Sequence, residues 1–321
     1  MTDLATRPEL QLEQHRAELT GYCYRMLGSA FEAEDAVQET LLRAWKSLDR
    51  FEGRSALRSW LYRIATNVCL DMLDGRARRA RPMEISEQVH ADVSLPEPVA
   101  ETTWIEPVPD GLVLPANADP ADLALARETI RLAFVAALQH LPARQRATLI
   151  LCEVLRWKAS EVAELLDTSV ASVNSSLQRA RATVAALDID AGGSSPEVDE
   201  SQRELLARYV DAFERYDMSA LVTLLADDAI QSMPPYAMWL EGAENVIAWC
   251  SGPGIACKGS RLVPVAASGG MAFAQYRVDP NGGHAPWAIQ ILEVSDGRIS
   301  GFHSFLDTDL FAAFGLPAHL N

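Results

Sequence analysis

The chain of 321 residues lacks any uninterrupted apolar run of the roughly 18 residues that a membrane-spanning helix needs. Its first residues, MTDLATRPELQLEQHRAE, are too charged for a signal peptide. We therefore expect a cytoplasmic protein with no membrane partner. The length favours two or three domains, because a single core usually stops growing near about 250 to 300 residues.

Cysteine is scarce, and its pattern argues against a metal or redox centre. The five cysteines form no C-x-x-C pair. Cys23, Cys69 and Cys152 have apolar neighbours and are best interpreted as small core residues. Cys250 and Cys257 are close in sequence, but no histidine lies near them, so a redox or metal role is the less favoured alternative. We expect neither a metal ion nor a cofactor.

Lysine and arginine are absent from residues 82–122, and the whole chain has a formal net charge of −16. The acid is concentrated there and in residues 191–321, whereas residues 1–81 and 123–190 are each close to neutral. Recurrent prolines predict an extended segment without helix, with Trp104, Ile105 and Leu112 as apolar anchors. A solvated tether is the alternative. The carboxylates of this segment are Glu84, Glu87, Asp92, Glu97, Glu101, Glu106, Asp110, Asp119 and Asp122.

Proline is also absent from residues 16–79, and the apolar spacing there is helical. In AEDAVQETLLRAWKSL, we expect one buried stripe, formed by Val37, Leu41, Trp45 and Leu48. Asp35, Gln38 and Glu39 fall on another face, which spacing alone would describe as a solvated surface.

A second helix is predicted within FEGRSALRSWLYRIATNVCLDML, after a loop that contains glycine. Arg63, Asn67 and Asp71 share a face away from its apolar positions. Beyond this helix come four guanidinium groups that can neutralise phosphates, on Arg76, Arg78, Arg79 and Arg81.

These two stretches together resemble region 2 of bacterial sigma factors of the extracytoplasmic-function (ECF) group. The resemblance implies that the D-A-V-Q-E helix docks on core RNA polymerase through Asp35, Gln38 and Glu39. It also implies that the loop and the next helix capture a base flipped from the −10 element, with Phe51, Ser55 and Asn67 at the matching positions. Arg63 and the arginines after the helix would contact the same DNA. Simple packing is the alternative for Phe51.

Residues 127–186 are helical again and end in a helix-turn-helix pattern. We expect Val162, Leu165 and Leu166 to face inward from its first helix, and Val170, Val173 and Leu177 from its second. The turn is DTS, with Asp167 where many such units have glycine. Residues 169–181 then offer short polar groups, amides and guanidinium groups to a major groove, on Ser169, Ser172, Asn174, Ser175, Gln178, Arg179 and Arg181.

The stretch LPARQRATLIL followed by ASEVAELLDTSVASVNSSLQRAR resembles region 4 of sigma factors, which implies reading of the −35 element. In that family the segment between regions 2 and 4 threads through polymerase along basic surfaces. An acidic chain anchored by Trp104 can occupy such a path as a nucleic-acid mimic.

After DAGGSSPEVDE the pattern changes to helices followed by alternating strands with a turn at Asp296-Gly297, which predicts an α+β domain. This part resembles the SnoaL-like cone fold, which includes ligand binders, polyketide cyclases and isomerases. The resemblance allows an interior pocket that binds a small molecule, lined by Tyr236, Trp239, Trp287 and His303. Met233, Tyr276, Gln290 and Asp307 are further candidates for the lining. No catalytic carboxylate motif matches residue by residue, so a regulatory packing domain is favoured over a ligand sensor, and a ligand sensor over an enzyme.

The predicted fold is multidomain, with two all-α domains and a C-terminal α+β SnoaL-like domain. The domains are residues 10–81 (region 2), 82–122 (acidic linker), 123–190 (region 4) and 199–321 (SnoaL-like). The predicted function is that of an alternative sigma factor, without catalytic residues, that binds core RNA polymerase and promoter DNA and is modulated by its C-terminal domain. The rivals are a freestanding helix-turn-helix repressor and a cyclase- or isomerase-like enzyme fused to a DNA-binding chain.

Overall fold

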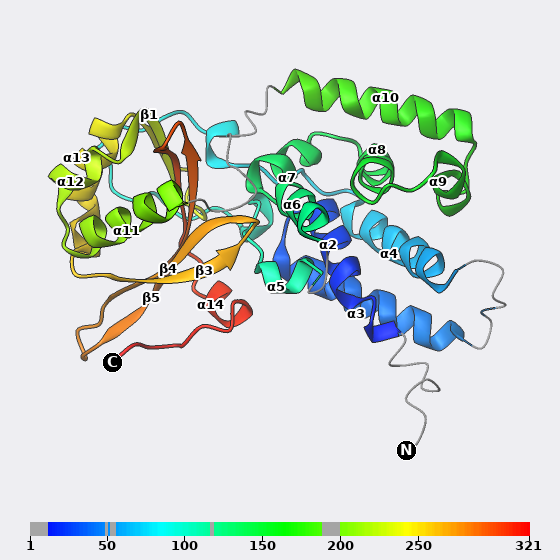
Figure 1. The fold of residues 1–321 in the computed structure, drawn as a ribbon, viewed down its shortest axis with the longest axis horizontal. Helices are drawn as coiled ribbons and strands as arrows, with labels where there is room; N and C mark the ends of the chain where they lie inside the picture. Colours follow the sequence, from blue (N-terminus) through cyan, green and yellow to red (C-terminus); the bar gives the residue numbers. More distant parts are fainter. Residues whose placement is uncertain (1–11, 49–50, 52–55, 116–118, 188–199) are drawn as a thin grey trace, which may run out of the picture. The chain divides into compact units, whose positions relative to one another are not determined.

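The computed structural model describes residues 12–48, 51, 56–115, 119–187 and 200–321. The chain divides into two compact units (Figure 1). The helical unit comprises Met1–Arg79 and Gly111–Ile189. The sheet unit comprises Ala80–Asp110 and Asp190–Asn321. Each unit is therefore built from two separate stretches of the chain.

The first part of the helical unit consists of three helices, α2 (Arg16–Leu27), α3 (Ala30–Ser47) and α4 (Leu57–Leu73). Helix α2 ends at Gly28, whose φ of 75° suits glycine, and the Ser29 side chain then caps the start of α3. Between α2 and α4, the hydroxyl groups of Tyr22 and Thr66 form a buried hydrogen bond of 2.8 Å. The helical prediction for this region is confirmed.

The second part of the helical unit begins with α5 (Asp110–Val113), which crosses the unit boundary. The longer helices follow, namely α6 (Pro120–Glu128), α7 (Leu132–Gln139), α8 (Ala143–Leu149), α9 (Ala159–Leu165) and α10 (Val170–Ala186). A π-helical turn, Ile150–Val154, continues α8. Pro142 is the N-cap of α8 and Ser169 that of α10. Helices α9 and α10 form the expected helix-turn-helix.

Two buried arginines join the two parts of the helical unit. Arg25 of α2 donates to the Thr129 hydroxyl at 2.8 Å and to the Thr129 carbonyl at 3.1 Å. Arg146 of α8 donates to the carbonyl of Met26 and to the Gln139 side chain. Burial lowers the pKa of each guanidinium to about 10. Because buried charges need hydrogen-bond partners, these contacts fix α2 against the helices of the second part.

The sheet unit contains a six-stranded sheet in the order β2-β1-β6-β5-β4-β3. Strands β1 (Leu225–Ser232) and β6 (Arg298–Phe305) are parallel, and the other neighbours are antiparallel. The remaining strands are β2 (Trp239–Glu241), β3 (Arg261–Ala267), β4 (Gly270–Val278) and β5 (His284–Ser295). The helices of this unit are α11 (Glu200–Glu214), α12 (Met218–Val222), α13 (Ala243–Ser251) and α14 (Leu310–Ala313). The α+β prediction is confirmed.

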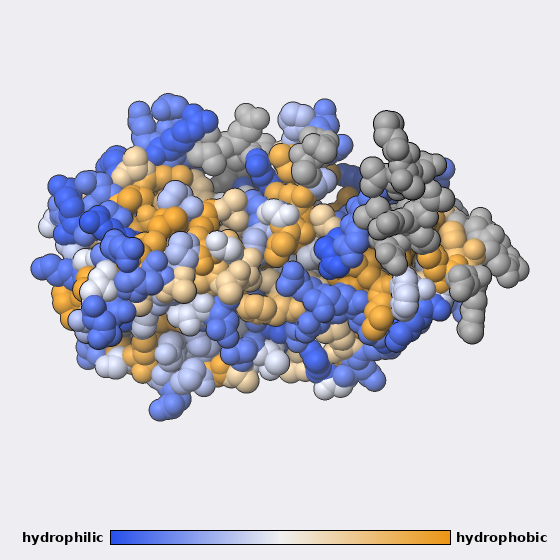
Figure 2. Space-filling view, turned by 90° about the horizontal axis from the view of Figure 1, so that it is seen from below, coloured by the Kyte–Doolittle hydropathy of each residue, from blue (hydrophilic) through white to orange (hydrophobic). Residues whose placement is uncertain are grey.

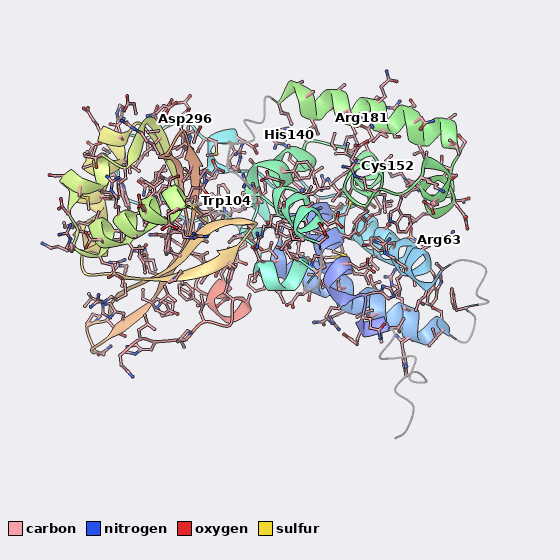
Figure 3. All side chains as sticks on the ribbon, viewed as in Figure 1. Arg63, Trp104, His140, Cys152, Arg181 and Asp296 are labelled. Atoms are coloured by element: carbon pink, nitrogen blue, oxygen red, sulfur yellow. The ribbon has the colours of Figure 1, made fainter. Side chains whose placement is uncertain are left out.

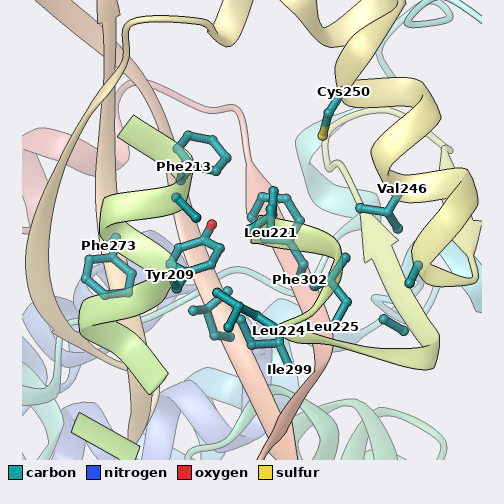
Figure 4. Packing of buried hydrophobic residues seen from close by; sticks show 14 of the residues in the cluster. Tyr209, Phe213, Leu221, Leu224, Leu225, Val246, Cys250, Phe273, Ile299 and Phe302 are labelled. Atoms are coloured by element: carbon teal, nitrogen blue, oxygen red, sulfur yellow. The ribbon is translucent and has the colours of Figure 1, made fainter. Parts of the chain in front are cut away.

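The core of the sheet unit lies between helices α11, α12 and α13 and one face of the sheet (Figure 4). The ring of Tyr209 is 5.7 Å from those of Phe213 and Phe273 and 6.1 Å from that of Phe302. The turn Asp296-Gly297 joins β5 to β6 with φ values of 50° and 73°, as the sequence predicts. Large aromatic groups thus fill the space beneath the sheet.

Residues 80–110 fold with the sheet unit. The Ala80 N–H donates to the Thr103 carbonyl at 2.8 Å, and the Ile105 N–H donates to the Ala80 carbonyl at 3.3 Å, so the segment closes into a loop. The prediction that its prolines exclude helix is wrong, because 3-10 turns form at Pro82–Glu84 and Glu101–Thr103 and α6 starts at Pro120. Proline lacks an N–H that the first helical turn does not use, so it is compatible with helix starts.

Two apolar positions that the sequence places in the core are exposed. Trp45 in α3 is 56% exposed and Val170 at the start of α10 is 43% exposed. Ala44 and Ala180 are fully buried instead. Trp45 directly follows buried Ala44, so its side chain is turned by about 100° from the buried position and reaches the solvent side of the stripe. Apolar residues also reach the surface on the face shown in Figure 2.

Candidate polymerase and nucleic-acid interface

One face of α3 combines the three predicted polymerase contacts with two exposed apolar side chains. Asp35 and Gln38 are exposed and Glu39 is half-buried. Leu42, at 43% exposure, and Trp45 follow at helical spacing, so all five lie within one face. Among the described residues, Leu42 and Trp45 are the only large exposed apolar pair on a single helix. Helical spacing had placed Trp45 in the buried stripe and did not single out Leu42.

The predicted −10 contacts Phe51, Arg63 and Asn67 lie just before α4 and along it. Arg63 and Asn67 are exposed on this helix, and the Phe51 ring is 5.0 Å from that of Trp60. Ser55 lies outside the described residues. The structure therefore places an aromatic pair near the start of α4 and polar groups further along it. A base removed from its stack needs both kinds of partner.

The arginines of the −10 set have intramolecular partners. Arg63 donates to the Glu164 carbonyl in α9 at 3.1 Å, and Arg78 contacts the His140 ring at 3.2 Å (Figure 3 labels Arg63 and His140). Arg76 and Arg79 both pair with Glu32. Arg79 is only 6% exposed, and its predicted contact with −10 DNA stays a prediction. Its charge neutralises Glu32.

Helix α10 exposes every side chain predicted to read the −35 element, namely Ser169, Ser172, Asn174, Ser175, Gln178, Arg179 and Arg181. The helix is held from its other side by Val173 and Ala180, which are 1% and 0% exposed. Arg179 donates to the Ser175 hydroxyl at 3.0 Å, and Arg181 pairs with Glu153. Figure 3 shows Arg181 on α10.

The turn between α9 and α10 needs a left-handed residue. Asp167 has a φ of 50°, and the Thr168 N–H donates to the Ala163 carbonyl at 2.9 Å. This is the hydrogen bond that closes a helix end in which glycine is usual. Asp167 therefore keeps the helix-turn-helix geometry at a cost in backbone strain.

The structure gives different partners to the four residues predicted to line a C-terminal pocket, and the pocket stays a prediction for Tyr236, Trp239 and Trp287. The Trp239 indole donates to the Ser86 carbonyl at 3.0 Å, and Tyr236 bridges to Pro98. The Trp287 ring lies 4.0 Å from the Arg277 guanidinium. His303 Nδ1 forms a 2.8 Å hydrogen bond with the Ser232 hydroxyl, and its Nε2 is 3.6 Å from the Glu293 carboxylate.

The strand register shows which of the residues predicted to line the pocket face the core of the sheet unit. His303 follows Phe302 along β6, so it points to the opposite face of the sheet from the aromatic core. The expectation that it faces the interior is therefore wrong. Met233 and Gln290 do lie inside. Asp307 follows β6, and partial burial raises the pKa of its carboxyl.

A chain of hydrogen bonds crosses the interior of the sheet unit. The Tyr209 hydroxyl donates to Gln290 at 2.8 Å, and the Gln290 amide donates to Gln275 at 2.8 Å. The Gln275 amide then donates to the Ser260 hydroxyl at 2.9 Å. These buried polar groups bond to one another, as a packed core requires.

No helix in the described part of the chain is long and apolar enough to cross a membrane. The same residues contain no cluster of three or more histidine, cysteine or carboxylate groups that would hold a metal ion.

Comparison with known proteins matches three family models along the chain. Residues 12–79 match Sigma-70 region 2, residues 131–184 match Sigma-70 region 4, and residues 206–302 match a SnoaL-like domain. The ECF RNA polymerase sigma factor SigG of Mycobacterium tuberculosis is 46% identical over 314 residues, which cover 96% of this chain and 83% of SigG. The chain belongs to the ECF sigma factors. Recognition of this family from the sequence is confirmed.

Other relatives show which parts of this sigma factor are shared. SigW of Bacillus subtilis is 33% identical over 159 residues, covering 50% of this chain and 76% of SigW. SigJ of M. tuberculosis is 26% identical over 313 residues, covering 94% of this chain and 92% of SigJ. The crystal structure of SigJ has the same fold, with a TM-score of 0.59, 22% identity, and coverage of 96% of this chain and 98% of SigJ.

Proposed function

We propose that this sigma factor directs core RNA polymerase to specific promoters and reads them through two separate surfaces. The observation that carries the proposal is the outward face of α10, where all seven predicted DNA-contacting side chains are exposed. Short serines, an amide-bearing Asn174 and the Arg179 guanidinium fit the edges and phosphates of a major groove.

Polymerase binding is assigned to α3. Asp35, Gln38 and Glu39 provide the polar contacts, and Leu42 and Trp45 provide apolar area at the same face. Interfaces are typically organised around an aromatic anchor that is surrounded by polar groups, and Trp45 supplies that anchor. Exposure of an indole costs free energy in the isolated chain, which polymerase binding would recover.

The −10 element is assigned to the start of α4 and the residues that follow it. Phe51 and Trp60 offer a stacking surface, Asn67 offers an amide to a base edge, and Arg63 offers a charge to phosphate. Ser55 is kept in this set from its position in the motif.

The C-terminal domain is assigned a regulatory role. Its interior contains Tyr209, Gln290 and Gln275 bonded to one another, an arrangement that supports packing over catalysis. A small-molecule ligand remains the alternative for this domain, and it would act by binding one arrangement of the chain more tightly than another.

The deciding experiment is run-off transcription with purified core polymerase. Promoter-specific RNA that depends on this protein is the expected result. The absence of RNA, together with tight binding of the protein alone to duplex DNA, would support a repressor instead. Turnover of a small molecule by the full chain would support the enzyme alternative.

A further inference from the structure

Residues 86–110 are held at both edges of the six-stranded sheet. At β2, one edge strand, the Trp239 indole donates to the Ser86 carbonyl at 3.0 Å and the Val89 N–H donates to the Trp239 carbonyl at 3.1 Å. At the turn after β3, the other edge strand, the Ser268 N–H donates to the Val108 carbonyl at 2.8 Å. The segment therefore spans the width of the sheet.

Further contacts hold the segment between these edges. The Trp249 indole of α13 donates to the Val93 carbonyl at 3.1 Å, and the Val99 N–H donates to the Pro235 carbonyl at 2.8 Å. Val89, Ala91 and Leu95 pack against the core of the sheet unit. The contacts thus continue along the segment from one edge to the other.

The two tryptophans show that the domain surface is built for this segment. An indole N–H is only a donor, and a half-buried one needs an acceptor. Trp239 and Trp249 find theirs on backbone carbonyls seven residues apart in the segment. Carbonyl acceptors are independent of side-chain identity, so these two hydrogen bonds hold the backbone of the segment whatever side chains it carries.

The far end of the segment is fixed by the turn between β3 and β4. The Val108 N–H donates to the Ser268 hydroxyl at 3.1 Å, and the Gly269 N–H donates to the Asp110 carboxylate at 2.8 Å. Val108 is fully buried, and Trp104 and Ile105 are 2% and 3% exposed. These three apolar residues of the segment are thus already covered.

We propose that the C-terminal domain is a docking surface for residues 86–110 of its own chain, and that core RNA polymerase competes with this surface for the segment. The inference rests on the proposed function, in which the segment between regions 2 and 4 enters polymerase. A segment whose Val108, Ser86 and Val93 are bonded to the domain cannot at the same time take a path along polymerase. The segment is therefore either docked on the C-terminal domain or bound along polymerase. The fraction of molecules in each state depends on the difference between the affinities of the domain and of polymerase for the segment.

The competition can be tested by variants that change the domain and leave the segment intact. The double variant Trp239→Phe/Trp249→Phe removes both indole donors and keeps an aromatic ring at each position. Ser268→Gly removes the hydroxyl acceptor, and glycine suits the φ of 50° at this position. The matched control is Tyr216→Phe, which loses hydroxyl bonds to Cys250 and Gly254 within the same unit.

The first measurement is hydrogen exchange in the full chain at the amides of Val89, Val99 and Val108. We expect exchange about tenfold faster in the double variant and in Ser268→Gly than in the wild type, with little change in the control. Unchanged exchange in both would show that these groups do not hold the segment, and the docking surface would be rejected.

The second measurement is the affinity of each full chain for core polymerase. We expect Trp239→Phe/Trp249→Phe and Ser268→Gly to bind polymerase about tenfold more tightly than the wild type and the control. In these variants the C-terminal domain holds the segment less tightly and competes less with polymerase. Faster exchange with equal or weaker binding would overturn the competition. Loss of polymerase binding by wild type and control alike would refute the proposed function instead, so the two failures are distinguishable.

Discussion

Arg63 in α4 donates a hydrogen bond to the carbonyl of Glu164 in α9, and its charge lies 3.7 Å from the Glu164 carboxylate. A residue assigned to −10 DNA is thus bonded to the helix-turn-helix assigned to −35 DNA. The proposed contact of Arg63 with −10 DNA would require Arg63 to exchange this partner for a phosphate group. Both side chains are largely exposed, so their ion pair contributes about 1 kcal/mol or less and is easily replaced.

Substitution of Arg63 and substitution of Glu164 should have different effects on promoter binding. We expect Arg63→Ala to weaken binding of the polymerase complex to −10 DNA and to lower the slope of its salt dependence by about one, because one phosphate contact is lost. Glu164→Ala should leave binding unchanged or strengthen it. The measurement is a salt titration of promoter binding, and equal losses for both variants would mean that Arg63 only joins the two regions.

Trp45→Ala should weaken binding to core polymerase by about tenfold, which corresponds to about 1.4 kcal/mol. Because the side chain is mostly exposed, the free energy of unfolding should change by about 0.5 kcal/mol or less. Affinity measurements and denaturation of the same samples test both statements. Val278→Ala, with the same 56% exposure in the other unit, is the control and should bind normally.

Asn174→Ala should relax sequence preference at one base pair of the −35 element. An amide that bonds a base edge contributes about 1 to 3 kcal/mol of discrimination, and its loss narrows the difference between promoter variants. Arg181→Ala provides the contrast, because a phosphate contact should weaken all promoters alike. Transcription from a set of single-base −35 variants makes the comparison. An unchanged preference profile for Asn174→Ala would remove this residue from base reading.

Asp167→Gly should stabilise the helix-turn-helix by about 0.5 to 1 kcal/mol, because glycine adopts a φ of 50° without the clash of a side chain. Asp167→Ala keeps the clash and should give no such gain. Thermal denaturation of the full-length wild type, Asp167→Gly and Asp167→Ala tests this order of stability. A higher midpoint for the alanine variant than for the glycine variant would contradict the assignment of strain.

The sequence predicted most of the local structure because the signals for it are local. The absence of proline from residues 16–79 and the glycine and serine at Gly28 and Ser29 are consistent with the helices found there. Asp296-Gly297 predicted the hairpin, since both residues tolerate positive φ. The outward face of α10 also followed from spacing, because a helix repeats every 3.6 residues.

Helical spacing could not say which of two apolar faces on α3 is buried, and Trp45 was assigned to the wrong one. The order of the sheet, with β1 parallel to β6, depends on pairing between strands that are about 70 residues apart. Burial of His303 on the outer face follows from that register rather than from its neighbours in sequence.

The sequence by itself determined the family, the order of its regions and the positions of the helices, because capping residues, prolines and apolar periodicity act over a few residues. Only the tertiary structure decided which part of the protein residues 86–110 of the acidic segment pack against. Its prolines and carboxylates indicate an extended chain, but its partners Trp239, Trp249 and Ser268 lie more than 140 residues further along. Contacts between residues so far apart in sequence depend on how the folded surfaces pack together. Local sequence patterns do not predict that packing.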